Sequence, residues 1–377
     1  MMRIRMFKLT GILVLFTVCG CVYKGGAVYV GDANQPVWQS VREHLVSPKQ
    51  LADSGLEIVW QNELPIKQGE SLDKLIILGD KLCVLSNRNF LTVLNRFDGS
   101  IVFSKVFAEA EFPVIGLGSY QDELFTIESR RLIEMNPQSG ADIRITSLEF
   151  TAACPAVRNS AFFYIAGTDG RIRAFRAADM VKMFEVGAPD DSAINSVVAE
   201  DEFVVFTTDT GRCISFAANA SKYLWQFDAE GGIVGPLAKN GDSVFFGSKD
   251  TYVYRLEAAT GKFIWKCLMG ERLEKGPDVA AKCVYRYSRN KGLAAIDRAS
   301  GKILWRLPEG KRLIAEAGDK AYLASGVDGI IVADIGKSER QSGISIPGVS
   351  KYAVNAIDSK IYIADDMGRI ACLKPTK

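Results

Sequence analysis

The chain carries one nine-residue pattern twice, as EAATGKFIW at residues 257–265 and as DRASGKILW at residues 297–305. In each copy a Thr/Ser-Gly-Lys turn leads into an apolar strand, with a tryptophan four residues after the glycine. The turn glycines Gly261 and Gly301 are 40 residues apart, and so are Trp265 and Trp305. A period of this length built from short strands predicts a repeat architecture, in which similar small sheets follow one another along the chain.

A second repeated signal is a hairpin, in which an aromatic-aliphatic strand turns back into an alternating strand. Turns such as Thr168-Asp169-Gly170 supply the aspartate and glycine that tight hairpins need. Four antiparallel strands in forty residues make one blade of a β-propeller. The sequence therefore predicts an all-β fold, an eight-bladed β-propeller of four-stranded antiparallel blades. The eight hairpins span Leu85–Leu94, Thr126–Met135, Tyr164–Phe175, Val205–Phe216, Phe245–Leu256, Tyr285–Ile296, Tyr322–Ala333 and Tyr362–Leu373.

The glycine and the aromatic residue of the first pattern survive unevenly in the other units. Some units keep a turn glycine, others keep only the aromatic residue, and the unit after Asp334 has lost the pattern. A large ring at the same place in each unit indicates packing between neighbouring blades. We expect this role for Trp60, Phe103, Phe184, Trp225, Trp265 and Trp305. We expect the turns to be formed by Gly99, Gly140, Gly261 and Gly301.

The two ends of the repeat complement each other. The last unit ends at Leu373 without room for a fourth strand, whereas Leu56–Trp60 is a strand without a unit. We expect the N-terminal strand to complete the C-terminal blade, which closes the ring and removes an exposed edge. The propeller is thus assigned to residues 56–377. Residues 21–55 are expected to form a tether with a short helix at Pro36–Leu45, or else to lie against the side of the propeller.

Residues 1–20 have the features of a targeting segment. Three basic residues precede the apolar run Leu9–Val18, which is too short to span a bilayer and is typical of a secretory signal peptide. The run ends in VCGC at residues 18–21, which resembles the bacterial lipobox. This resemblance implies cleavage between Gly20 and Cys21 and lipidation of Cys21; Cys19 fits the lipobox less well. An ordinary signal peptide is the alternative.

Composition excludes one class of partner and says little about the cysteines. Without the three basic residues of the leader, 43 basic residues stand against 44 acidic ones, so no net attraction to nucleic acid is expected. Six cysteines follow Cys21, and no two of them are adjacent or spaced as CxxC. They are interpreted as small buried side chains. Cys267 and Cys283 form the one pair to examine for a disulfide.

The repeat resembles the PQQ-type propeller repeat over residues 56–377, most clearly at Gly261–Trp265 and Gly301–Trp305. Within that superfamily, quinoprotein dehydrogenases hold their quinone against a disulfide of adjacent cysteines, which this chain lacks. The resemblance is closer to the BamB-like lipoproteins, which are non-enzymatic. It implies no cofactor or metal, a lipid anchor in the bacterial envelope, and protein partners, including the β-barrel assembly machinery. The residue after Cys21 is Val22, not the aspartate that resembles a retention signal in enteric bacteria. This favours the outer membrane, with the protein facing the periplasm. Binding of a quinone, a small molecule or a polysaccharide remains the alternative.

Several charged groups could be sites or ordinary surface. The arginines of residues 171–176 and the basic residues of 286–298 could recognise an acidic partner or phosphate groups, but solvated blade rims have the same composition. The pairs Asp190-Asp191 and Asp365-Asp366 are interpreted as turn residues rather than a Ca²⁺ site. His44 is interpreted as a surface residue.

Overall fold

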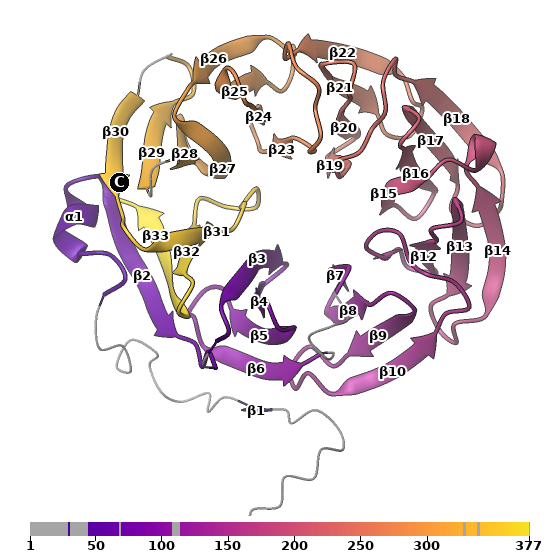
Figure 1. Cartoon of the computed structure of the whole chain (residues 1–377), viewed down its shortest axis with the longest axis horizontal. Helices are drawn as coiled ribbons and strands as arrows, with labels where there is room; N and C mark the ends of the chain where they lie inside the picture. The colour runs from indigo at the N-terminus through magenta and orange to yellow at the C-terminus, as the bar shows by residue number, and fades with distance from the viewer. Residues whose placement is uncertain are drawn as a thin grey trace, which may run out of the picture.

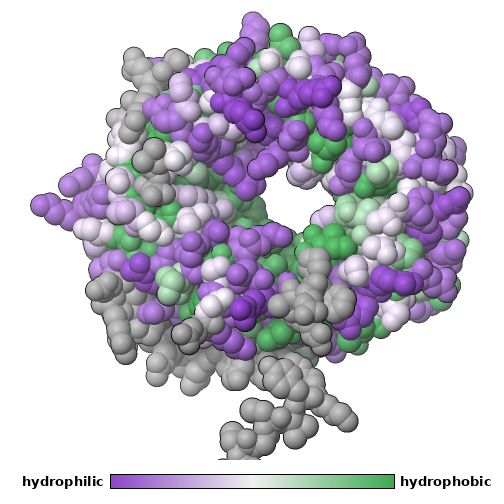
Figure 2. All heavy atoms as spheres, viewed as in Figure 1, coloured by the Kyte–Doolittle hydropathy of each residue, from purple (hydrophilic) through white to green (hydrophobic). Residues whose placement is uncertain are grey.

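A computed structural model describes residues 29–30, 44–67, 69–107, 114–326, 329–337 and 340–376. Eight antiparallel sheets stand in a ring, seven of four strands and one of five (Figure 1). The ring is open at its centre (Figure 2). This arrangement confirms the predicted eight-bladed β-propeller.

Each blade runs from a strand near the ring axis to a strand on the perimeter (Figure 1). Blades 1 to 4 are β3 (Leu72–Leu78), β4 (Lys81–Ser86), β5 (Phe90–Asn95), β6 (Ile101–Val106); β7 (Gly116–Tyr120), β8 (Glu123–Ile127), β9 (Arg131–Met135), β10 (Asp142–Ser147); β11 (Val157–Arg158), β12 (Phe162–Ala166), β13 (Arg171–Arg176), β14 (Lys182–Gly187); β15 (Ile194–Ala199), β16 (Phe203–Thr208), β17 (Arg212–Ala217), β18 (Tyr223–Asp228). Blades 5 to 8 are β19 (Ala238–Asn240), β20 (Ser243–Gly247), β21 (Tyr252–Glu257), β22 (Phe263–Leu268); β23 (Asp278–Val279), β24 (Cys283–Ser288), β25 (Gly292–Asp297), β26 (Ile303–Leu307); β27 (Gly310–Ala317), β28 (Lys320–Ser325), β29 (Gly329–Asp334), β30 (Arg340–Ser345); β31 (Val349–Tyr352), β32 (Ile361–Asp365), β33 (Arg369–Pro375), β2 (Leu56–Glu63).

The hydrophobic core is divided among the seams between blades. Eight clusters of buried side chains are found in the described chain, one at each seam. At the seam of blades 5 and 6, for example, Phe245 and Trp265 pack with Val284 and Ile296. Every blade therefore depends on both neighbours for its burial, as expected of a repeat protein.

The ring is closed by the N-terminal strand, as predicted. Strand β2 pairs antiparallel with β33, from Leu56 opposite Pro375 to Glu63 opposite Arg369. Blade 8 is thus built from both ends of the repeat (Figure 1).

Part of the segment before β2 lies against the ring. Strand β1 (Tyr29–Val30) pairs with Ser104 and Phe103 on the outer edge of β6. Helix α1 (Pro48–Ala52) contacts β2, and Leu51 joins the core at the seam of blades 7 and 8. The helix predicted at 36–45 falls outside the described residues except for His44 and Leu45, which are not helical. A 3-10 turn, Pro189–Asp191, joins blades 3 and 4. No helix in the described part of the chain has the length and apolarity to cross a membrane.

All eight outer strands contain a β-bulge at the same place. In β22, Phe263 pairs with Leu256 and Trp265 pairs with Arg255, so that Ile264 between them has no partner. A bulge strengthens the local twist and re-aims the extra side chain. The bulged residues are Val59, Val102, Ile143, Met183, Leu224, Ile264, Leu304 and Gln341. Seven of these eight residues are apolar.

Candidate functional site

Four of the six predicted packing residues meet a predicted turn glycine of the next blade across a seam. A Cβ atom added to Gly261 would lie 2.5 Å from the Trp225 ring, and one added to Gly301 would lie 2.6 Å from the Trp265 ring. Both glycines also have positive φ angles, of 72° and 74°. Only glycine combines this backbone conformation with such a close approach. Gly99 against Trp60 and Gly140 against Phe103 repeat the arrangement.

A hydrogen bond fixes each tryptophan of these seams. The Trp265 indole N–H donates to the carbonyl oxygen of Arg298 at 3.0 Å, three residues before the glycine that the ring covers. Trp60, Trp225 and Trp305 donate in the same way, at 3.0, 3.1 and 3.2 Å. Phe184, which has no such donor, packs edge-on to Phe216 in blade 4. These residues lie inside the seams, where they hold blades together.

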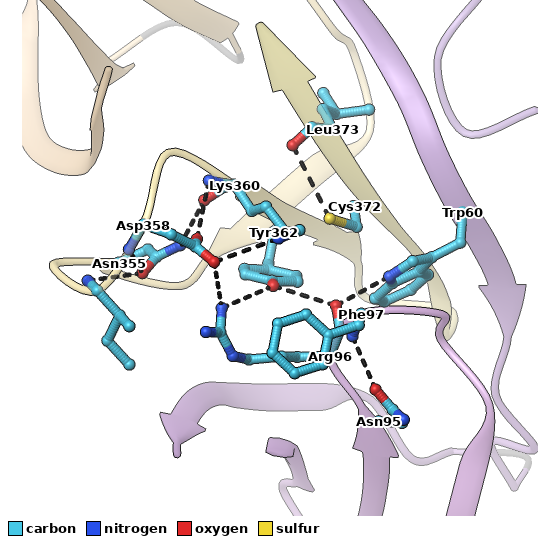
Figure 3. A network of polar contacts seen from close by, with 11 residues as sticks. Trp60, Asn95, Arg96, Phe97, Asn355, Asp358, Lys360, Tyr362, Cys372 and Leu373 are labelled. Carbon is cyan, nitrogen blue, oxygen red and sulfur yellow. Dashed lines mark hydrogen bonds and ion pairs between the residues drawn. The ribbon is translucent and has the colours of Figure 1, made fainter. Parts of the chain in front are cut away.

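The seam of blades 8 and 1, where the ring closes, has additional polar contacts (Figure 3). Arg96, whose side chain is only 6% exposed, forms a 2.8 Å ion pair with Asp358. The hydroxyl of Tyr362 donates to the backbone oxygen of Arg96 at 3.1 Å, and the Trp60 indole donates to the same oxygen. We call Arg96, Asp358, Tyr362 and Trp60 the closing latch. It ties blade 1 to β2, to β32 and to the loop before β32 in blade 8.

Asp358 is strongly biased toward its charged form. Burial alone would raise the pKa of this carboxyl group, but the backbone N–H of Lys360, the Asn355 amide and Arg96 together lower the pKa to about 2. Asn355 itself is buried and donates to Asp358 at 2.6 Å. The latch is thus an ion pair with a supporting hydrogen-bond network.

The arginines of residues 171–176 form ion pairs, and Arg298 of the second basic cluster forms a hydrogen bond. In blade 3, Arg171 pairs with Glu185 at 2.8 Å, and Arg176 contacts Asp179 at 2.9 Å. In blade 6, Arg298 donates to Asn240 at 2.6 Å. These contacts fit the interpretation as blade rim.

The aspartate pairs lie in turns, as interpreted. Asp190 has a positive φ angle and an ion pair with Arg212 at 2.7 Å, and Asp365 accepts from the backbone of Met367 at 2.9 Å. Among the described residues, no group of three or more His, Cys, Asp or Glu is placed to hold a metal ion.

The six cysteines after Cys21 are buried free thiols, and Cys267 is not bridged to Cys283. Burial raises the pKa of Cys83, Cys154, Cys283 and Cys372 to about 12. Because the thiolate is the reactive form, these side chains are poor nucleophiles near neutral pH. Cys21 and Gly20 lie outside the described residues.

A surface that sequence reasoning missed runs along the outer strands of blades 2 to 6. Ile143 is 63% exposed and Leu268 is 53% exposed, although both are large apolar side chains. Between blades 4 and 5 the surface is joined by a stack of Phe227 on Phe263, with ring centroids 6.2 Å apart. We call this surface the apolar rim; it comprises Ile143, Ile145, Met183, Tyr223, Leu224, Phe263, Ile264, Leu268, Ile303 and Leu304. Extended exposed apolar surface of this kind marks sites of interaction.

A groove of about 690 Å³ indents the rim between blades 2 and 3. Ile143 and Met183 form part of its lining, together with Arg144 and Arg158. Arg144 holds Glu134 with two contacts of 2.5 and 2.8 Å. The Arg158 guanidinium lies over two aromatic rings, with 5.0 Å to each centroid. The groove therefore combines apolar side chains with arginines that are already engaged.

The comparison with protein families matches the blades that carry the clearest repeats. Residues 211–337 match the family model described as outer membrane protein assembly factor BamB. This confirms the BamB-like resemblance over that part of the chain. A comparison with curated proteins gives no match.

Solved structures match the fold of the whole ring. BamB from Moraxella catarrhalis is similar with a TM-score of 0.64 and 15% identity, covering 85% of this chain and 97% of that one. The computationally designed Ika8 protein is similar with a TM-score of 0.63 and 13% identity, covering 82% and 98%. Because a designed ring matches about as well as a natural one, this likeness establishes the fold and not a role.

Proposed function

We propose that this protein is a lipid-anchored, non-enzymatic scaffold of the bacterial cell envelope, and that it assists the assembly of outer-membrane β-barrel proteins. The observation that carries the proposal is the match of residues 211–337 to the BamB assembly-factor model. The matched segment contains β18, β22 and β26, where much of the apolar rim is exposed. The family likeness and the candidate contact surface thus overlap on blades 4 to 6.

The architecture supports binding rather than chemistry. A propeller presents many loops and edges on a rigid frame, which suits contact with partner proteins. The buried thiols are unsuited to nucleophilic attack, and the adjacent cysteines that the quinoprotein alternative needs do not occur in the chain. A non-enzymatic role fits these features best.

The partner proposal is tested by crosslinking in intact cells that produce the tagged full-length protein. Purification under denaturing conditions is expected to recover components of the β-barrel assembly machinery, enriched at least tenfold over a tagged, unrelated envelope lipoprotein. Recovery of only unrelated proteins would remove the assembly role and leave the scaffold role without this partner.

The anchor is tested by two cysteine substitutions in the leader. Cys21→Ser is expected to abolish incorporation of labelled palmitate and to move the protein from the membrane fraction to the soluble periplasmic fraction, since acyl chains supply durable anchoring. Cys19→Ser, two residues away, is the matched control and is expected to remain lipidated. Equal labelling of the two variants would contradict lipidation at Cys21.

A further inference from the structure

The described residues before β2 cover the outer edge of the ring in the sector of blades 7, 8 and 1. On blade 1, β1 extends the sheet as a fifth strand by pairing with β6. On blades 7 and 8, residues around α1 are buried at the seam, and the Gln50 side chain donates to the backbone oxygen of Ser345 in β30 at 2.6 Å. For the outer strands of blades 2 to 6, the described residues provide no further strand.

The exposed apolar side chains have the complementary distribution. Blades 2 to 6 carry the whole apolar rim, whereas the outer strands of blades 7, 8 and 1 expose only Val59 among their described large apolar residues. Blade 7 has Gln341 at the bulge, where blades 2 to 6 have apolar residues. The rim is absent where described residues cover the outer edge, and it is present where no described strand is added to that edge.

The pairing of β1 also shows where a strand is accepted. It meets Phe103 and Ser104, the two residues that follow the bulge at Val102. The equivalent positions in β22 are Trp265 and Lys266, which follow the bulge at Ile264. Beyond this bulge, four successive pairs of β22 with β21 are regular, so the edge is straight enough to serve as a template.

We propose that the outer edges of blades 2 to 6, and β22 above all, bind an extended segment of a partner polypeptide as an added antiparallel strand, in the way that β6 holds β1. The proposal rests on the proposed function and names the form of the partner. Backbone hydrogen bonds to the edge accept many sequences, while alternating apolar side chains of the segment pack on residues such as Ile264 and Leu268. The partner is therefore a chain with alternating apolar and polar residues that has not yet paired its own strands.

A peptide experiment tests strand addition directly. The probe is a fluorescent ten-residue peptide that alternates valine or tyrosine with threonine, and its control is the same peptide N-methylated at every residue, so that neither edge of the strand keeps its donors. N-methylation removes backbone donors and keeps the side chains, so the control is expected to bind at least tenfold more weakly. Hydrogen exchange of the complex is expected to slow at the outer strands β18, β22 and β26. Equal binding of the two peptides, or protection confined to the central channel, would overturn the proposal.

A rim variant tests the surface in the full mature protein. Glutamine is the substitution used, because blade 7 has it at this position. The control variant changes two residues that are 60% and 72% exposed but lie in turns, Ile357→Gln and Met367→Gln. The rim variant is expected to bind the peptide at least tenfold more weakly and to keep its unfolding midpoint, since it alters exposed side chains only. It carries Ile143→Gln, Met183→Gln, Leu224→Gln, Ile264→Gln and Leu304→Gln.

The outcomes separate this inference from the proposed function. Unchanged peptide binding by the rim variant would place the site elsewhere and overturn the inference. If crosslinking in cells still recovered assembly components with that variant, the scaffold role would stand without strand addition. If crosslinking recovered none while the peptide bound as described, strand addition would stand and the assembly role would fall.

Discussion

Replacing Gly301 by alanine is expected to lower the free energy of unfolding by about 3 kcal/mol. About 1 kcal/mol comes from a side chain at a φ of 74°, and the rest from a Cβ atom placed 2.6 Å from the Trp265 ring. The ring cannot simply move aside, because its N–H is bonded to Arg298 and its faces are packed in the seam. Urea unfolding followed by tryptophan fluorescence measures the change.

Gly318→Ala is the matched control for this variant. Gly318 also has a positive φ angle, of 58°, but an added Cβ atom would meet nothing within 4 Å. Gly318→Ala is expected to lower the free energy of unfolding by about 1 kcal/mol, because only the cost of a side chain at a positive φ angle applies. If the two variants lost equal stability, the contact between glycine and tryptophan across the seam would not be what restricts the residue at 301.

The second large effect is expected from Arg96→Met in the closing latch, at about 3 kcal/mol. Methionine preserves much of the volume but removes the cation that Asp358 meets across the seam of blades 8 and 1, so that Lys360 of its own blade, at 3.3 Å, is the ion-pair partner left. Arg176→Met is the control, because its pair with Asp179 is exposed on both sides and screened by solvent, so its loss is expected to change stability little. Similar losses in the two variants would contradict a special role for the latch.

The same latch gives the protein a defined acid sensitivity. The pKa of Asp358 lies at about 2 in the folded ring, below its ordinary value of 3.8. The ionised carboxylate therefore contributes fully to the free energy of unfolding above about pH 4, and this contribution is lost as the pH falls toward 2. In the Arg96→Met variant this part of the pH dependence is expected to shrink. The measurement is the free energy of unfolding of the unchanged protein and of Arg96→Met at pH 5 and at pH 2.5. The difference between the two proteins is expected to be smaller at pH 2.5.

The architecture could be predicted because its signals are local and repeated. Each hairpin carries its own turn residues, and the spacing of Gly261, Gly301, Trp265 and Trp305 gives the period without knowledge of any distant contact. Ring closure followed from counting strands at the two ends, and β2 pairs with β33 accordingly.

Features that depend on distant residues left no comparable signal. Arg96 and Asp358 are 262 positions apart, so nothing near either residue predicts their contact. The helix expected at 36–45 lies outside the described residues except for His44 and Leu45, and apolar spacing did not predict α1, which begins at Pro48 and has five residues. A helix of that length is too short to be stable alone, and burial of Leu51 supports it.

The sequence contains a signal of the apolar rim, which is missed when strands are expected to alternate strictly between apolar and polar residues. Phe263-Ile264-Trp265 and Ile303-Leu304-Trp305 place three large apolar residues in succession, which a regular strand with one solvated face does not do. The bulge explains the run, because it lets Trp265 remain buried while Ile264 is exposed. Apolar triplets at the start of an outer strand therefore indicate a bulge of this kind.

The pairing of Leu56–Glu63 with Arg369–Pro375 has a consequence for how the molecule is made. A ribosome delivers β2 before the strands β3 to β32, and its partner β33 after all of them. During synthesis and any N-terminus-first passage through a translocation pore, β2 must wait with an unsatisfied edge until about three hundred further residues have emerged. A chain that terminates anywhere in the repeat would leave β2 unpaired. Incomplete chains are therefore expected to need protection against self-association until β33 has been synthesised.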